Sequence, residues 1–145
     1  MIKASEPIGD NVPTSTRYDH AARLAFLEAR GEVSREEATA QIRAACAELA
    51  DLTLRHPTGQ YGVLLDTRAS STVPKPADII AVLDEIGRRT PAPSPGRWAI
   101  LATEPAHYGM GRLFGTYAEA RGLDVRVFTT LDSAVAWLSS PVPGG

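Results

Sequence analysis

The chain has 145 residues and a mass of 15.5 kDa, which suits one domain with a buried core and is too short for two independent domains. Hydrophobic residues make up 43% of the chain and charged residues 22%, which excludes a chain that is disordered throughout. The formal net charge of -2 gives no overall attraction to nucleic acid or to an anionic membrane surface, so we expect neither as a partner.

The cysteine count and the lack of targeting segments bear on the cellular compartment, and a single cysteine points to a reducing one. Cys46 is the single cysteine, so no internal disulfide can form, and no Cys/His cluster has the spacing of a zinc site. Residues 1–16 lack the pattern of a signal peptide, and no stretch reaches the length of a membrane span. We therefore expect a cytoplasmic protein with no membrane insertion, no metal and no cofactor.

Proline and glycine mark the domain boundaries. Residues 1–14 and 141–145 are polar or rich in Pro and Gly, and we expect both as flexible tails around one domain at residues 15–140. Residues 90–96 include three prolines. They predict a stiff connector inside that domain, because proline has no amide donor for a helix or a sheet.

The first part of the domain, residues 17–33, is ambiguous. Its composition favours a helix, but Leu24, Phe26 and Leu27 form no repeated helical stripe. The segment also lies before Gly31 and a helix cap, as a hairpin does before a helix. We predict two strands here.

A helix is predicted next, over Ser34 to Leu54. Ser34 and Glu37 form a capping box, and apolar residues follow on one face at helical spacing. A turn at 56–59 ends the helix. Tyr61 to Asp66 is then a short apolar run, typical of a strand that is buried on both faces at the centre of a sheet.

The remaining elements alternate between helix and strand. Periodicity and turn residues predict helices over 76–89 and 107–121, the second ended by Gly122, and a last helix capped by Thr130. Strands are predicted over 98–103 and, nearer an edge of the sheet, over 124–129. The order ββαβαβαβα predicts an α/β fold with a mixed, mostly parallel sheet of about five strands and four helices.

Four local strings resemble a known family. They are Leu64-Leu65-Asp66-Thr67-Arg68, the helix start Tyr108 to Phe114, the strand Val125 to Phe128 and the helix segment Ala134 to Leu138. Together with the order of elements, they resemble the SpoIIAA-like proteins of the STAS superfamily, which includes anti-sigma factor antagonists. The resemblance covers roughly residues 15–139. It implies a sheet with helices packed on it and a role in binding a protein partner or a small apolar ligand; a flavodoxin-like sheet is the alternative fold.

The regulatory serine of that family is not carried over. In the antagonists a phosphorylatable serine lies in an Asp-Ser-Ser/Thr-Gly string, whereas the corresponding residues 70–78 read Ser-Ser-Thr-Val-Pro-Lys-Pro-Ala-Asp. Ser70, Ser71 and Thr72 provide hydroxyls near a helix start, where a phosphate is electrostatically favoured. Without the motif, nothing selects one of them.

Candidate binding residues lie where strands end and helices begin, because ligands of open α/β sheets bind at that edge. Three loops qualify, at 66–71, 103–108 and 129–132. The candidates are Asp66, Arg68, Ser70, Ser71, His107, Tyr108 and Arg112. An Asp at a strand end more often caps a loop or pairs with a cation, and His107 with Glu104 fits a helix cap better than acid-base chemistry.

For the other residues that could carry chemistry, a purely structural role is the better interpretation. Gly109 and Gly111 hint at a phosphate cradle but lack the rest of a motif, so we favour a packing role for Gly111 and Gly115. Cys46 is expected to be buried and inert. The acidic residues of the first two helices, Glu36, Glu37, Asp78 and Glu85, are expected on solvated faces and not as metal ligands.

The sequence has a well-patterned core and no complete catalytic motif, and we rank three hypotheses for its function on that basis. The leading hypothesis is a non-enzymatic regulatory module that binds a protein partner, with a homodimer as a further possibility. The rival is a carrier of a small apolar ligand, in which Val82, Met110 and Phe114 line a pocket between helices and sheet. An enzyme of unknown reaction ranks third.

Overall fold

The computed structural model describes residues 13–55, 61–89 and 97–140. Most of the predicted N-terminal tail lies outside these ranges, as do the C-terminal tail at 141–145, the turn at 56–59 and the proline-rich connector at 90–96. The strands are β1 (Thr14–Asp19), β2 (Leu24–Gly31), β3 (Gly62–Ser70), β4 (Trp98–Leu101) and β5 (Val125–Phe128). The helices are α2 (Arg35–Arg55), α3 (Pro76–Arg89), α4 (Pro105–Glu119) and α5 (Leu131–Ser139).

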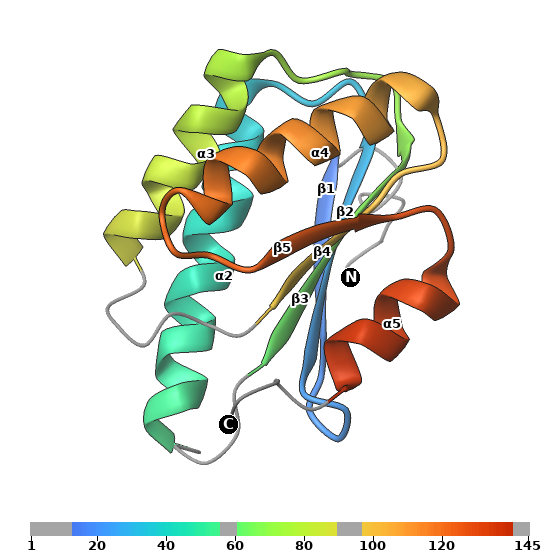
Figure 1. Cartoon of the computed structure of the whole chain (residues 1–145). Helices are drawn as coiled ribbons and strands as arrows, with labels where there is room; N and C mark the ends of the chain where they lie inside the picture. The colour runs from blue at the N-terminus through green and yellow to red at the C-terminus, as the bar shows by residue number, and fades with distance from the viewer. Residues whose placement is uncertain (1–12, 56–60, 90–96, 141–145) are drawn as a thin grey trace, which may run out of the picture.

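The five strands form one sheet in the order β1-β2-β3-β4-β5 (Figure 1). β1 pairs with β2 antiparallel, and all the other pairs are parallel. From β2 onward, each strand is added to the same edge of the sheet as the one before it. Connections between parallel strands are right-handed crossovers. The crossover helices α2, α3 and α4 therefore lie on the same face, and α5 is the one helix within the described ranges that lies on the other.

The opening hairpin confirms the prediction of two strands. Pairing runs from Thr14 opposite Ala29 to Asp19 opposite Leu24. The chain turns between the strands with Arg23 at φ 58°, and the Asp19 carboxylate accepts from the Ala22 amide at 3.0 Å. Tertiary pairing with β3 outweighs the helix-forming composition of this segment.

The predicted helix caps are confirmed. The Ser34 hydroxyl accepts from the Glu37 amide at 3.1 Å, and the Glu37 carboxylate accepts from the Ser34 amide at 2.8 Å, which is a reciprocal capping box. At α5 the Thr130 side chain accepts from the Ser133 amide. Gly122 has φ 79° after the end of α4, where the chain reverses at low conformational cost.

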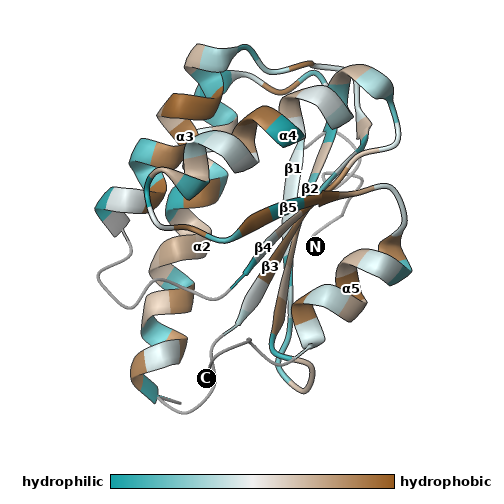
Figure 2. Ribbon diagram, in the orientation of Figure 1, coloured by the Kyte–Doolittle hydropathy of each residue, from teal (hydrophilic) through white to brown (hydrophobic). Residues whose placement is uncertain are grey.

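The sheet separates two clusters of apolar side chains. The larger cluster lies between the sheet and α2, α3 and α4, and it includes Cys46, which is fully buried as predicted. The smaller cluster contains Leu64, Ala99, Leu101 and Ala134 and lies between the sheet and α5. Figure 2 shows that apolar residues dominate the central strands while the helices carry both apolar and polar residues. β4 is buried along its whole length.

Three details of the sequence prediction are wrong. Residues 66–70 are not a loop, because the long strand β2 continues beside them and pairs Gly31 with Ser70. α4 begins at Pro105, two residues before His107, because proline fits the first turn of a helix. Glu85 is 3% exposed, because Arg43 of α2 and Arg88 form ion pairs with it.

Candidate functional site

A cavity of about 160 Å³ lies between the sheet and the three crossover helices. Its apolar walls include Leu65 and Ile100 of the sheet and the helix residues Ile42, Val82, Met110 and Phe114. Val82, Met110 and Phe114 are the side chains for which the sequence predicted a pocket. Most of the lining is apolar, and a few polar groups converge on it, which is the usual composition of a small-molecule site.

Helix N-termini border one end of the cavity. Ser34 and Arg35 at the start of α2, Asp78 in the first turn of α3 and His107 in the first turn of α4 all line it. This arrangement follows from the parallel connections, since each crossover helix begins at the carboxyl end of a strand. The cavity therefore opens toward the edge at which the sequence placed its candidate residues.

An ion pair joins two of these helix starts. Arg35 Nε lies 2.7 Å from Asp78 Oδ1, and Asp78 Oδ2 accepts from the Lys75 amide at 2.8 Å. The hydrogen bond from Lys75, followed by the one from Arg35, lowers the pKa of Asp78 below its ordinary value. Asp78 therefore holds α2 and α3 together at the cavity and is not a merely solvated residue.

The segment between β3 and α3 is fixed by its hydroxyl groups. The Thr72 hydroxyl accepts from the Val33 amide at 2.9 Å, and the Ser70 hydroxyl accepts from the Thr72 amide at 3.2 Å. Both residues line the cavity. Ser71 is exposed, and its amide donates to the Gly31 carbonyl.

His107 is the buried titratable side chain of the cavity wall. It is 7% exposed, and its Nε2 lies 2.9 Å from the Thr72 carbonyl oxygen. Its Nδ1 is buried and has no hydrogen-bond partner within the described part of the chain. Glu104 is the N-cap residue of α4, but its side chain forms no cap hydrogen bond. The predicted capping arrangement of Glu104 with His107 is therefore wrong.

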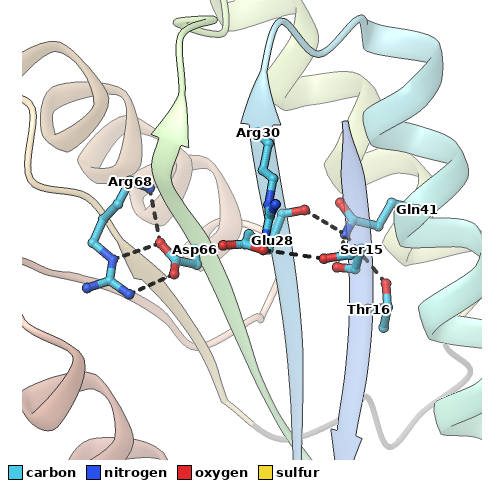
Figure 3. A network of polar contacts seen from close by, with 7 residues as sticks. All are labelled: Ser15, Thr16, Glu28, Arg30, Gln41, Asp66 and Arg68. Atoms are coloured by element: carbon cyan, nitrogen blue, oxygen red, sulfur yellow. Dashed lines mark hydrogen bonds and ion pairs between the residues drawn. The ribbon is translucent and has the colours of Figure 1, made fainter. Parts of the chain in front are cut away.

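Asp66 and Arg68 belong to a second site, on the face of the sheet that carries α5. The two side chains form an ion pair at 2.9 Å. The side-chain hydrogen bond to Asp66 raises the pKa of Arg68 above its ordinary value. Figure 3 shows Glu28, Arg30 and Ser15 in the same row across β3, β2 and β1. Glu28 pairs with Arg30 at 3.0 Å. The expected pairing of Asp66 with a cation is confirmed.

This row is part of an uncovered half of the sheet. Of the described helices, only α5 lies on this face, and it packs mainly on β3, β4 and β5. Arg17 of β1 and Arg30 of β2 are exposed there, while Leu24 of β2 is buried. The Arg17 guanidinium lies 4.2 Å from the centre of the Phe26 ring, and Arg68 is exposed on the same face. We call these three arginines with Phe26, Glu28 and Asp66 the open sheet face.

The structure divides the predicted site residues into three groups. Ser70 and His107 line the cavity, and Asp66 borders it while pairing with Arg68 on the open sheet face. Tyr108 is half-buried on α4, Arg112 is exposed on the same helix and Ser71 is exposed after β3, and none of the three is a lining residue of the cavity described above. The seven residues therefore do not form one site.

Sequence reasoning missed three charged or amide side chains of the cavity. They are Arg35, Gln41 and Asp78. The Gln41 amide donates to the Ser15 carbonyl at 2.9 Å (Figure 3). These residues lie on helices whose polar positions resemble an ordinary solvated face. A usable signal existed only for Asp78, which lies three residues after Lys75 with a proline between them, the spacing of a helix cap.

Comparisons with known proteins now bear on this architecture. No protein-family model matches the chain, and no curated protein matches its sequence. Among solved structures, an anti-sigma factor antagonist from Mycobacterium paratuberculosis is similar with a TM-score of 0.57 and 17% identity, over 88% of this chain and 93% of that one. A second similar structure is an uncharacterised protein with a SpoIIAA-like fold from Shewanella loihica, with a TM-score of 0.53 and 13% identity, over 86% of this chain and 91% of that one.

The protein has the SpoIIAA-like fold. The flavodoxin-like alternative is excluded, because the sheet follows chain order and carries an antiparallel first strand. Within the described ranges, the SpoIIAA-like domain has no group of three or more His, Cys, Asp or Glu side chains that could hold a metal ion. None of its described helices is long and apolar enough to cross a membrane.

Proposed function

We propose that this SpoIIAA-like protein is a non-enzymatic binding module that takes up a small apolar molecule. The observation that carries the proposal is the cavity of about 160 Å³ with apolar walls between the sheet and α2, α3 and α4. A close-packed interior holds few voids larger than a water molecule. An apolar cavity of about 150 Å³ engineered in another protein binds benzene, so this volume suits a single ring or a short branched chain.

The location of the cavity supports a binding role. It lies at the carboxyl ends of parallel strands, where open α/β sheets bind their ligands. Apart from His107 Nδ1, its buried polar lining groups are already engaged, as in the Arg35–Asp78 pair and the Thr72 hydroxyl, which suits retention of a ligand more than a reaction on it. Uptake of a ligand would also stabilise the fold, by an amount that rises with the logarithm of the ligand concentration once that concentration exceeds the Kd.

A matched pair of variants on one helix tests this proposal. Ala38 lines the cavity, whereas Ala40, two residues further along α2, is exposed and is not a lining residue. Toluene titrated into the labelled protein should shift the amide resonances of cavity residues. Ala38→Phe should abolish these shifts because the new ring fills the volume, while Ala40→Phe should preserve them. Shifts that persist in a folded Ala38→Phe protein, or no shifts in the wild type, would overturn the proposal.

A second candidate function is binding of a protein partner on the open sheet face. The observation in its favour is the row of exposed arginines beside Phe26, a combination that is frequent at the centre of protein interfaces. The similar anti-sigma factor antagonist has the same fold. Loss of partner capture on substitution of Arg68 tests this candidate, and a ligand in the cavity on the opposite face would leave the surface accessible.

A further inference from the structure

Among the described residues that line the cavity, every buried side-chain nitrogen or oxygen atom but one has a hydrogen-bond partner within the protein. The Thr67 hydroxyl donates to the Leu101 carbonyl at 2.8 Å, and the Thr72 hydroxyl accepts from the Val33 amide at 2.9 Å. The Asp78 carboxylate is held by Arg35 and by the Lys75 amide. Groups that already have good partners gain little from a ligand.

His107 is the exception. Its ring lines the cavity and is more than nine-tenths buried. Because a backbone carbonyl can only accept, the contact of Nε2 with the Thr72 oxygen at 2.9 Å places the ring proton on Nε2 in the neutral imidazole. Nδ1 is then an acceptor, and it has no partner among the residues that the structure describes.

An unpaired hydrogen-bond acceptor in the interior destabilises the protein. A ligand that brings a hydrogen-bond donor to Nδ1 removes this penalty, whereas a purely apolar ligand of the same shape leaves it in place. A hydroxyl suits this acceptor better than a carboxylate, because an ionised carboxylate has no proton to donate to Nδ1.

We infer that the ligand is a compact apolar molecule of about one ring that bears a hydroxyl group, and that His107 Nδ1 accepts the hydrogen bond from this hydroxyl. The inference rests on the proposed function and names the chemical class of the ligand. Phenol is the simplest probe with these properties, and toluene is its matched counterpart, since the two differ by a hydroxyl in place of a methyl group.

A ligand can reach Nδ1 only if a side chain of the cavity wall moves, and Met110 is an adaptable lining side chain near His107 in the chain. In the structure protein atoms cover Nδ1. Met110 lies three residues after His107 on α4, hence on the same helix face, and it lines the same cavity. Its side chain is half-buried, unbranched and adaptable, so it can shift without disturbing the backbone.

The test compares the affinities of phenol and toluene for the wild type and for His107→Phe, by titration followed by NMR at about pH 8, where an ordinary imidazole is neutral. Burying a hydroxyl without a hydrogen-bond partner weakens binding by about tenfold or more. In the wild type, phenol should therefore bind no more than about threefold more weakly than toluene. In His107→Phe, phenol should lose at least about tenfold relative to toluene.

The outcomes separate the inference from the proposed function. If toluene binds the wild type and phenol does not, the inference on His107 fails and the apolar cavity site stands. If neither binds, the proposed function fails and the inference fails with it. Equal discrimination against phenol in the wild type and in His107→Phe also overturns the inference.

A measurement on the unmodified protein keeps the test decisive if His107→Phe does not fold. The ring nitrogens of His107 have separate ¹⁵N resonances, and the resonance of an unprotonated Nδ1 changes when it accepts a hydrogen bond. Saturation with phenol should shift the Nδ1 resonance and leave Nε2 protonated, while toluene should leave the Nδ1 resonance in place. Identical spectra with the two probes would contradict the inference.

Discussion

Single residues decide how closely the helices approach the sheet. A Cβ atom built on Gly111 would lie 2.9 Å from Cγ2 of Val127, and one built on Gly115 would lie 3.2 Å from the Val125 carbonyl oxygen. Glycine at these two positions of α4 lets the helix pack directly on β5. The packing role predicted for Gly111 and Gly115 is therefore confirmed.

A pair of glycine substitutions measures this close approach. Gly111→Ala should lower the free energy of unfolding by about 1–3 kcal/mol, because the added methyl overpacks the contact with Val127. Gly109→Ala on the same helix should raise it by about 0.5–1 kcal/mol, since a Cβ there meets nothing within 4 Å. Urea unfolding monitored by circular dichroism gives both values. A neutral or stabilising Gly111→Ala would contradict the packing role.

At the scale of elements, the start of α3 depends on Asp78, which caps the helix through the Lys75 amide and pairs with Arg35 of α2. The predicted start at Pro76 is confirmed. The contact with α2 could not be predicted, because Arg35 precedes Asp78 by 43 residues. One carboxylate thus links a local cap to the packing of two helices beside the cavity.

Asp78→Ala should lower the free energy of unfolding by about 1 kcal/mol at neutral pH, as the loss of a cap does. Because the pKa of Asp78 is lowered in the folded state, its charge stabilises the fold at pH values above the unfolded value of 3.8. That contribution is lost as the pH falls through the folded pKa. The difference between wild type and variant, measured by urea unfolding, should therefore shrink in acid.

Asp84→Ala is the control on the same helix. It removes an exposed ion pair with Arg121 and no cap, so it should lower the free energy of unfolding by less than about 1 kcal/mol. If Asp78→Ala were no more destabilising than Asp84→Ala at neutral pH, the capping role of Asp78 would be wrong.

The two faces of the sheet organise the whole molecule. Three crossover helices cover one face and enclose the cavity, while α5 covers only part of the other (Figure 1). Arg68 belongs to the open sheet face, and Arg112 lies on α4 across the sheet. The sequence grouped these two arginines in one candidate site, and the structure separates them.

Substitution of each arginine distinguishes the two surfaces as docking sites. If a protein partner binds the open sheet face, Arg68→Ala should weaken its capture by the purified protein by about tenfold, as loss of an interface arginine does, and Arg112→Ala should leave capture unchanged. Neither substitution should lower the melting temperature appreciably, because both side chains are exposed. The reverse pattern of capture would place the partner on α4 and reject the open sheet face.

The sequence predicted much of the fold but only part of the candidate site. Ser70 and His107 were found because they flank strand ends, where ligands of such sheets bind. Arg35 and Gln41 were missed, since a polar residue that faces a cavity has the same helical spacing as one that faces solvent.

The sequence alone determined the elements, because caps, turns and periodicity act within a few residues, as Ser34 with Glu37 and Thr130 with Ser133 show. The tertiary structure decided what depends on partners far along the chain. β3 continues to Ser70 because β2 lies beside it, and Glu85 is buried because Arg43, 42 residues earlier, reaches it. The cavity arises only where the sheet and three helices meet, since its volume is set by how closely those elements pack and not by any one of them.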